Sequence, residues 1–248
     1  MPTTRFDRLD ALRGTAIVWM TAFHFCFDLN HFGWIRQDFH ADPLWTLQRT
    51  AIVSLFLFCA GLSQAVAHGQ GQRWPRFWKR WAQVAGCALL VTAGSVVEFP
   101  RSYIFFGVLH GIAVMLVIVR LTAGWGRWLW PLGAVAILLP ALFGQLHAAM
   151  PSLEVLNGPP FHWLGLVSRK PITEDYVPLF PWLGVMWWGM AAGQWLLARR
   201  REVMTGPLAR GASPLAWLGR WSLTWYMVHQ PVLFGVFMLV QMVRGSAP

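Results

Sequence analysis

The sequence predicts an all-α polytopic membrane protein that forms a single domain over residues 1–248, and three observations lead to that prediction. Hydrophobic residues make up 56% of the chain and charged residues only 12%, whereas a soluble domain carries about 25% charged residues. The mean hydropathy is +0.46. The chain also contains 17 Trp, a residue type that is enriched at membrane–water interfaces.

Seven segments are mainly apolar over about the 20 residues that a transmembrane helix needs. We expect these spans at residues 14–33, 45–67, 80–98, 103–121, 128–146, 178–197 and 215–243. Pro231 lies inside the last span and removes a backbone donor, so we expect a kink there. The connection 147–177 is rich in Pro and Gly, and a loop of that length is often functional.

The distribution of Lys and Arg sets the expected orientation, because short cytoplasmic loops carry an excess of these residues. With the N-terminus inside, 14 of the 20 Lys and Arg residues fall on the inner side. The exceptions are Arg36, Arg49, Arg101, Arg169, Lys170 and Arg244. The net charge of +10 is thus explained by membrane topology and does not indicate a nucleic-acid partner. We predict a cytoplasmic N-terminus and a C-terminus outside.

The first span carries two ionisable residues, His24 and Asp28, where lipid-facing residues are expected. An ionisable side chain in hydrocarbon is costly and usually faces a protein interior or a watery cavity. Four residues separate the two, so on a helix they share one face. We interpret them as a proton-handling pair. Because no A-x-A-like cleavage site follows the apolar run, we expect this span to be retained.

Further polar residues fall near the same depth in the outer half of other spans. His110 is on the fourth span, and His40 is in the first outer loop. The remaining members of this predicted cluster, at or above that level, are Asp28, Arg49, Glu98 and Asp175. His229 lies nearer mid-membrane, where we expect it to cap the kink at Pro231. Each residue alone also fits a structural role, such as a core histidine or a buried ion pair, but several at one depth point to function.

The absence of several catalytic motifs limits the reactions that the sequence suggests. The sequence contains no GxSxG elbow, Walker loop, HExxH motif or metal-spaced His/Cys cluster. What remains is a His base, a carboxylate to orient it and a cation to hold an anion. These suit proton transfer during acyl transfer, and equally a proton relay in a transporter. On the inner side, Arg73, Arg76, Lys79 and Arg80 form a basic loop that suits phosphate groups or anionic lipid, with Arg13 at the base of the first span.

Five segments in order resemble the catalytic domain of heparan-α-glucosaminide N-acetyltransferase. They are RLDALRG with AFHFCFDLNHFG, then FLFCAG, FFGVLHGIA, DYVPLFPWLGVMWWG and SLTWYMVHQPVL. The resemblance covers nearly the whole chain and is greatest to the short bacterial members of that family. The last segment is also similar to the ending of inner-membrane acyltransferases that O-acetylate polysaccharides.

This resemblance implies an activity and a catalytic histidine. The family uses acetyl-CoA from the cytoplasmic side and delivers the acetyl group to a sugar acceptor on the far side. Counting back from the glycine of FLFCAG, the position of the family's catalytic histidine corresponds to His40, although the neighbouring residues depart from the family pattern. His24 instead resembles the histidine of the short bacterial members, and it has Asp28 on its face.

We therefore predict a multi-pass acetyltransferase of the bacterial inner membrane that acts on a sugar, cell-envelope glycan or amphiphilic acceptor. His24 is the expected general base with Asp28, His110 a second proton-handling group and His40 the alternative catalytic histidine. Arg49, Glu98, Asp175 and His229 are expected to bind substrate or stabilise charge. Acetyl-CoA is expected to bind at Arg13, Arg73, Arg76, Lys79 and Arg80. No metal is expected, the oligomeric state stays open, and the alternatives are a proton-coupled transporter and a non-catalytic scaffold.

Overall fold

The computed structural model describes residues 6–245, and helices form nearly all of its regular structure. The α-helices are α1 (Asp7–His31), α2 (Pro43–Gly69), α3 (Trp74–Glu98), α4 (Val108–Leu121), α5 (Leu129–Ala149), α6 (Leu179–Arg199), α7 (Arg201–Thr205), α8 (Ser213–Arg220) and α9 (Ser222–Gly245). Three 3₁₀ helices join them: η1 (Ala123–Trp128), η2 (Pro151–Asn157) and η3 (Pro159–Leu164). Within residues 6–245 no β-strand forms, and one isolated bridge joins Phe106 to Tyr176. The predicted all-α class is confirmed.

Four helical segments in the described part of the chain are long and apolar enough to cross a membrane. They are α2, α3, the continuous stretch of η1 and α5, and α9. The helix α1 is not among them, since its apolar part carries His24, Asp28 and Asn30. The helix α4 is apolar but has only 14 residues. The chain is therefore a multi-pass membrane protein, whereas seven spans and their orientation stay predictions.

Two predicted span boundaries are wrong. The segment predicted at 103–121 becomes helical only at Val108, because Gly107 is extended at the N-cap (φ −90°, ψ −167°). The segment predicted at 215–243 is two helices, α8 and α9, separated at Trp221 (φ −97°, ψ 18°). Pro231 lies inside α9, which stays helical on both sides of it.

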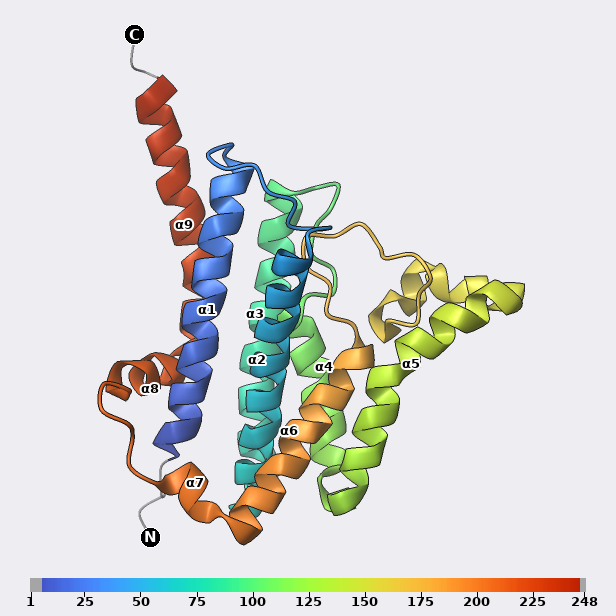
Figure 1. The fold of residues 1–248 in the computed structure, drawn as a ribbon, viewed down its shortest axis with the longest axis vertical. Helices are drawn as coiled ribbons and strands as arrows, with labels where there is room; N and C mark the ends of the chain where they lie inside the picture. Colours follow the sequence, from blue (N-terminus) through green and yellow to red (C-terminus); the bar gives the residue numbers. More distant parts are fainter. Residues whose placement is uncertain (1–5, 246–248) are drawn as a thin grey trace. The chain divides into compact units, whose positions relative to one another are not determined.

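The chain folds into two compact units, and the single domain expected from the sequence stays a prediction. The first unit runs up to Phe56 and resumes at Glu202. In it α1 packs against α8 and α9 (Figure 1). Two glycines allow a close approach: an added Cβ at Gly14 would lie 1.9 Å from the backbone oxygen of Leu215. At Gly219 it would lie 1.8 Å from that of Asp10.

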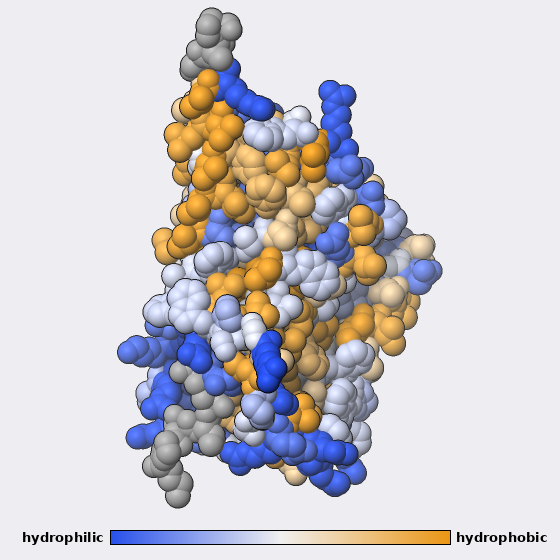
Figure 2. All heavy atoms as spheres, turned by 60° about the vertical axis from the view of Figure 1, so that its left-hand side comes forward, coloured by the Kyte–Doolittle hydropathy of each residue, from blue (hydrophilic) through white to orange (hydrophobic). Residues whose placement is uncertain are grey.

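The core of the first unit is apolar and aromatic. It is built from residues of α1 and α2 and of the loop between them: Ile17, Met20, Phe23, Phe39 and Ile52. Apolar side chains also cover the outer face of α9, which forms the orange column at the upper left of Figure 2. Such a continuous apolar surface is typical of a helix that faces lipid.

In the second unit, Leu57–Arg201, glycines allow neighbouring helices to pack closely. Added Cβ atoms would lie 2.2 Å from the Met186 backbone oxygen at Gly61 and 2.4 Å from the Gly133 oxygen at Gly184. Small residues let transmembrane helices approach closely. The predicted loop 147–177 carries η2 and η3, and the Tyr176 hydroxyl donates to the backbone oxygen of His162 at 2.6 Å.

Candidate functional site

Two histidines from distant parts of the chain meet in the first unit. His24 Nδ1 on α1 lies 2.8 Å from His229 Nε2 on α9. Their ring planes are inclined to one another by 24°, with centroids 4.9 Å apart. His24 is half-buried and His229 is only 6% exposed. The α1–α9 contact thus brings together two of the residues singled out by the sequence.

Asp28, one helical turn from His24, is completely buried and hydrogen-bonded to α9 as well. Its Oδ1 accepts from Gln230 Nε2 at 2.7 Å. Asp28 Oδ2 and Gln230 Oε1 are both buried without a hydrogen-bond partner among the described residues. Gln230 therefore links Asp28 to α9, whereas the sequence analysis paired Asp28 with His24 directly.

We call these four residues, His24, Asp28, His229 and Gln230, the α1–α9 polar cluster. The turn of α1 places His24 and Asp28 on one side, and consecutive residues of α9 supply the two partners. Sequence reasoning missed Gln230, although it sits beside His229 in the YMVHQP segment. A buried carboxyl, an amide and two imidazoles form a group that can take up and pass on a proton.

The alternative histidine, His40, has a different environment. It is exposed in the loop between α1 and α2, and its backbone N–H donates to Asp38 Oδ1 at 2.9 Å. The backbone N–H groups of Ala41 and His40 hold the pKa of Asp38 below its usual range. Within residues 6–245 the ring of His40 has no side-chain hydrogen bond.

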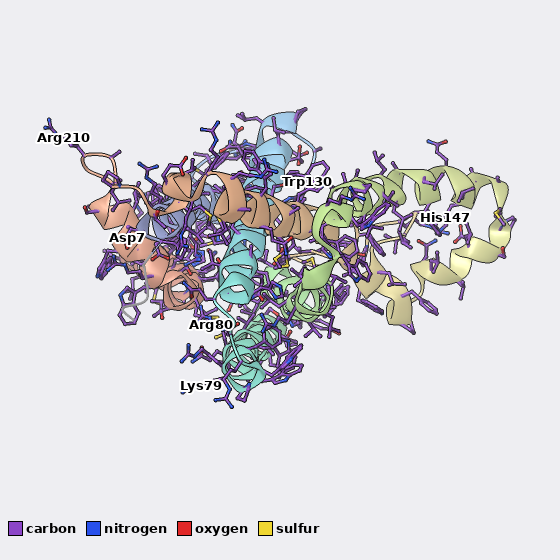
Figure 3. The ribbon with its side chains drawn as sticks, turned by 90° about the horizontal axis from the view of Figure 1, so that it is seen from below. Asp7, Lys79, Arg80, Trp130, His147 and Arg210 are labelled. Carbon is purple, nitrogen blue, oxygen red and sulfur yellow. The ribbon has the colours of Figure 1, made fainter. Side chains whose placement is uncertain are left out.

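The predicted acetyl-CoA ligands separate into two sets. Arg13 Nη1 contacts Asp10 Oδ1 at 3.0 Å and donates to the backbone oxygen of Gly219 at 3.2 Å. It ties α1 to α8 and lies in the first unit. The other set, Arg73, Arg76, Lys79 and Arg80, is exposed at the start of α3 in the second unit. Figure 3 shows Lys79 and Arg80 projecting outward from that helix.

His110 caps the start of α4 in the second unit. Its Nδ1 accepts from the backbone N–H of Gly107 at 3.3 Å, and its Nε2 lies 3.0 Å from Thr92 Oγ1. Thr92 in turn donates to the backbone oxygen of Ile104 at 2.7 Å. Both ring nitrogens are therefore used in local hydrogen bonds. The geometry supports a capping role, and the predicted proton-handling role of His110 stays a prediction.

Asp175 belongs to the same cap. Its Oδ2 accepts from the backbone N–H of Val108 at 2.7 Å, which satisfies a donor at the α4 N-terminus. An added Cβ at Gly107 would lie 2.3 Å from that oxygen, so a larger residue there would displace the Asp175 side chain. Arg49 and Glu98 belong to different units: Arg49 is half-buried in the first and Glu98 is exposed in the second. Their predicted roles in substrate binding or charge stabilisation stay predictions.

Comparison with known proteins gave one match. The family model described as "Heparan-alpha-glucosaminide N-acetyltransferase, catalytic" matches residues 5–231. The matched range contains every member of the α1–α9 polar cluster and the basic residues at the start of α3. No curated protein and no solved structure matches the chain.

Proposed function

The chain belongs to the heparan-α-glucosaminide N-acetyltransferase catalytic-domain family, and from that premise we propose that it moves an acetyl group from cytoplasmic acetyl-CoA to a sugar or cell-envelope glycan. In this proposal His24 is the general base. The family indicates a membrane acetyltransferase; we take the donor and the acceptor from what the resemblance implies, and we infer the base from the residues. We place the activity in a bacterial inner membrane.

The observation that carries this proposal is the contact of His24 with His229 beside a buried carboxyl. An imidazole whose one nitrogen is held by a buried partner is well placed to accept a proton with the other. His40 is exposed and lacks such a partner within residues 6–245. These environments favour His24 over His40 as the base.

His24 takes the proton of the acceptor hydroxyl or amine while a C–O or C–N bond forms at the acetyl carbonyl. The C–S bond of the thioester breaks, and His24 returns the proton to the departing thiolate. In a two-step variant the acetyl group first resides on a histidine nitrogen, and the acceptor then displaces it. In both routes the histidine ends in its starting protonation state, so the reaction balances without a metal or a redox partner.

The basic residues at the start of α3 fit the phosphates of acetyl-CoA. Arg73, Arg76, Lys79 and Arg80 are exposed and close in sequence, and Arg and Lys bind phosphate by charge and hydrogen bonds. Arg13 fits less well, since Asp10 and the Gly219 carbonyl already occupy Nη1. We therefore assign phosphate binding first to the four α3 residues.

The test uses purified full-length protein in lipid nanodiscs with radiolabelled acetyl-CoA. We expect saturable binding, and transfer of label to a cell-envelope glycan extract. General base catalysis typically contributes about 10²–10⁴-fold, so His24→Ala should lower transfer by at least about 100-fold while binding is retained. His40→Ala and the control His68→Ala, an exposed residue at the end of α2, should keep transfer.

Three results would overturn parts of this proposal. Absence of acetyl-CoA binding would exclude the transferase. Loss of transfer in His40→Ala, but not in His24→Ala, would move the base to His40. Proton uptake coupled to a small solute in proteoliposomes, without acetyl transfer, would favour the transporter that uses the same residues.

A further inference from the structure

The hydrogen bonds of His229 determine which of its nitrogens carries the proton. Its Nδ1 lies 2.9 Å from the backbone oxygen of Tyr226 and 3.2 Å from that of Trp225. A carbonyl oxygen only accepts hydrogen bonds, so Nδ1 must be the donor. In a neutral imidazole the second nitrogen is then an acceptor. His229 therefore presents the lone pair of Nε2 to its neighbour.

That neighbour is His24 Nδ1, at 2.8 Å. Because His229 Nε2 accepts, His24 Nδ1 must donate, and the proton of the neutral His24 ring resides on Nδ1. The lone pair of His24 is consequently on Nε2. The tautomer of His24 thus follows from a chain of contacts that begins at two backbone carbonyls of α9.

We infer that His229 is a positioning residue, which fixes His24 in the Nδ1–H tautomer and leaves Nε2 as its basic atom. This inference rests on the proposed function only for its catalytic meaning; the tautomer itself follows from the hydrogen bonds. Tautomer control of a histidine base by a hydrogen-bonded partner is an established device, usually supplied by a carboxylate. Here the partner is a second imidazole.

Three features hold the arrangement in place. His229 is 6% exposed, so a charge on its ring would lack solvation. The Tyr226 ring packs against it edge-on at 5.9 Å. Gln230, the next residue, is hydrogen-bonded to the buried Asp28, which fixes the register of α9 against α1. Rotation of His229 away from the carbonyls would leave its Nδ1–H unpaired in a buried position, which is unfavourable.

The side chains available for substitution make this inference testable. In His229→Leu no acceptor faces His24 Nδ1. In His229→Gln the amide oxygen reaches a position similar to that of Nε2 and accepts in its place. The second variant preserves the acceptor without the ring, so it separates the hydrogen bond from the packing. His162→Leu, in the second unit, is the matched control for removal of a histidine.

The first readout is ¹⁵N NMR of histidine-labelled protein in nanodiscs, with the His24 signals assigned by His24→Ala. We expect a protonated Nδ1 and an unprotonated Nε2 for His24 in the wild-type protein, in His229→Gln and in His162→Leu. In His229→Leu this preference should be lost. A protonated Nε2 on wild-type His24, or an unchanged tautomer in His229→Leu, would overturn the inference, whatever the activity of the protein.

The second readout is acetyl transfer. His229→Leu should lower kcat by about 10-fold or more with little change in the KM for acetyl-CoA, and His229→Gln should recover most of the loss. Equal loss in both variants would overturn the positioning role. If no variant and no wild-type sample transfers acetyl, the proposed function fails, and the NMR result still decides the tautomer.

Discussion

Gln230 is the polar partner of a carboxyl group that has no access to solvent. Asp28 is completely buried, and Gln230 Nε2 donates to it at 2.7 Å. Gln230→Leu removes that donor and leaves a buried carboxyl unpaired, which costs about 1–3 kcal/mol and more for a charged group. We expect the free energy of unfolding in detergent, measured by chemical denaturation, to fall by that amount.

Gln241→Leu provides the matched control on the same helix. Gln241 is exposed and donates to the backbone oxygen of Phe32 at 3.2 Å, so its loss should cost less than about 1 kcal/mol. The double variant Asp28→Leu with Gln230→Leu should be less destabilised than the sum of the single variants, because no polar group is then left unpaired. Equal destabilisation by Gln230→Leu and Gln241→Leu would contradict this account of Asp28.

At the residue scale, the sequence identified three of the four members of the α1–α9 polar cluster, namely His24, Asp28 and His229. His24 and Asp28 stand out because ionisable residues are rare in apolar helices, and the helical period places them on one face. Gln230 does not stand out, since an uncharged amide is unremarkable in a helix and its partner is 202 residues away in the chain. For His229, the sequence suggested a cap for a kink at Pro231, whereas the ring bonds the carbonyls of Trp225 and Tyr226 and contacts His24.

At the scale of the elements, the packing of α1 against α8 depends on two glycines. An added Cβ at Gly219 would lie 1.8 Å from the Asp10 backbone oxygen, and a backbone atom of a helix cannot rotate away. Gly219→Ala should therefore force the helices apart and cost about 1–3 kcal/mol or more. We expect a lower midpoint of thermal unfolding and a weaker Arg13 hydrogen bond to the Gly219 carbonyl.

Gly235→Ala is the matched control, because an added Cβ at this position meets no neighbouring atom. Gly235 lies in α9, with nothing within 4 Å of an added Cβ, and alanine stabilises a helix relative to glycine by up to about 1 kcal/mol. Its unfolding midpoint should stay the same or rise. If Gly219→Ala were as stable as Gly235→Ala, the close approach of α1 and α8 would be refuted.

The contact between α1 and α8 also explains why hydropathy alone placed the last predicted span wrongly. The residues of α8 and α9 are both apolar enough to read as one segment, so nothing in a hydropathy average marks the break at Trp221. The break accompanies a tertiary contact, since Arg13 of α1 bonds the Gly219 carbonyl near the end of α8. The fourth span was similarly overextended because Asp175, far along the chain, caps α4 at Val108. Local pattern predicts that helices exist, and long-range contacts set their ends.

At the scale of the whole molecule, the charge distribution predicts the orientation in the membrane. Positively charged loops remain in the cytoplasm, which places Lys79 and Arg210 inside and Arg36 and Arg244 outside. The long helix that leads from the inner side to Arg244, α9, has 24 residues. At 1.5 Å per residue it measures about 36 Å, which exceeds the hydrocarbon thickness of about 30 Å. Arg210 and Arg244 are therefore expected on opposite sides.

Single cysteine substitutions test this orientation in bacterial spheroplasts with a membrane-impermeant maleimide. Arg36→Cys and Arg244→Cys should react in intact spheroplasts, and Lys79→Cys and Arg210→Cys only after permeabilisation, since all four positions are exposed in the structure. The unsubstituted protein, with Cys26, Cys59 and Cys87 half-buried or buried, supplies the background. Labelling of Arg210→Cys and Arg244→Cys from the same side would show that α9 does not span. A fully reversed pattern would keep the spans and invert the orientation, placing the basic start of α3 on the side opposite to cytoplasmic acetyl-CoA.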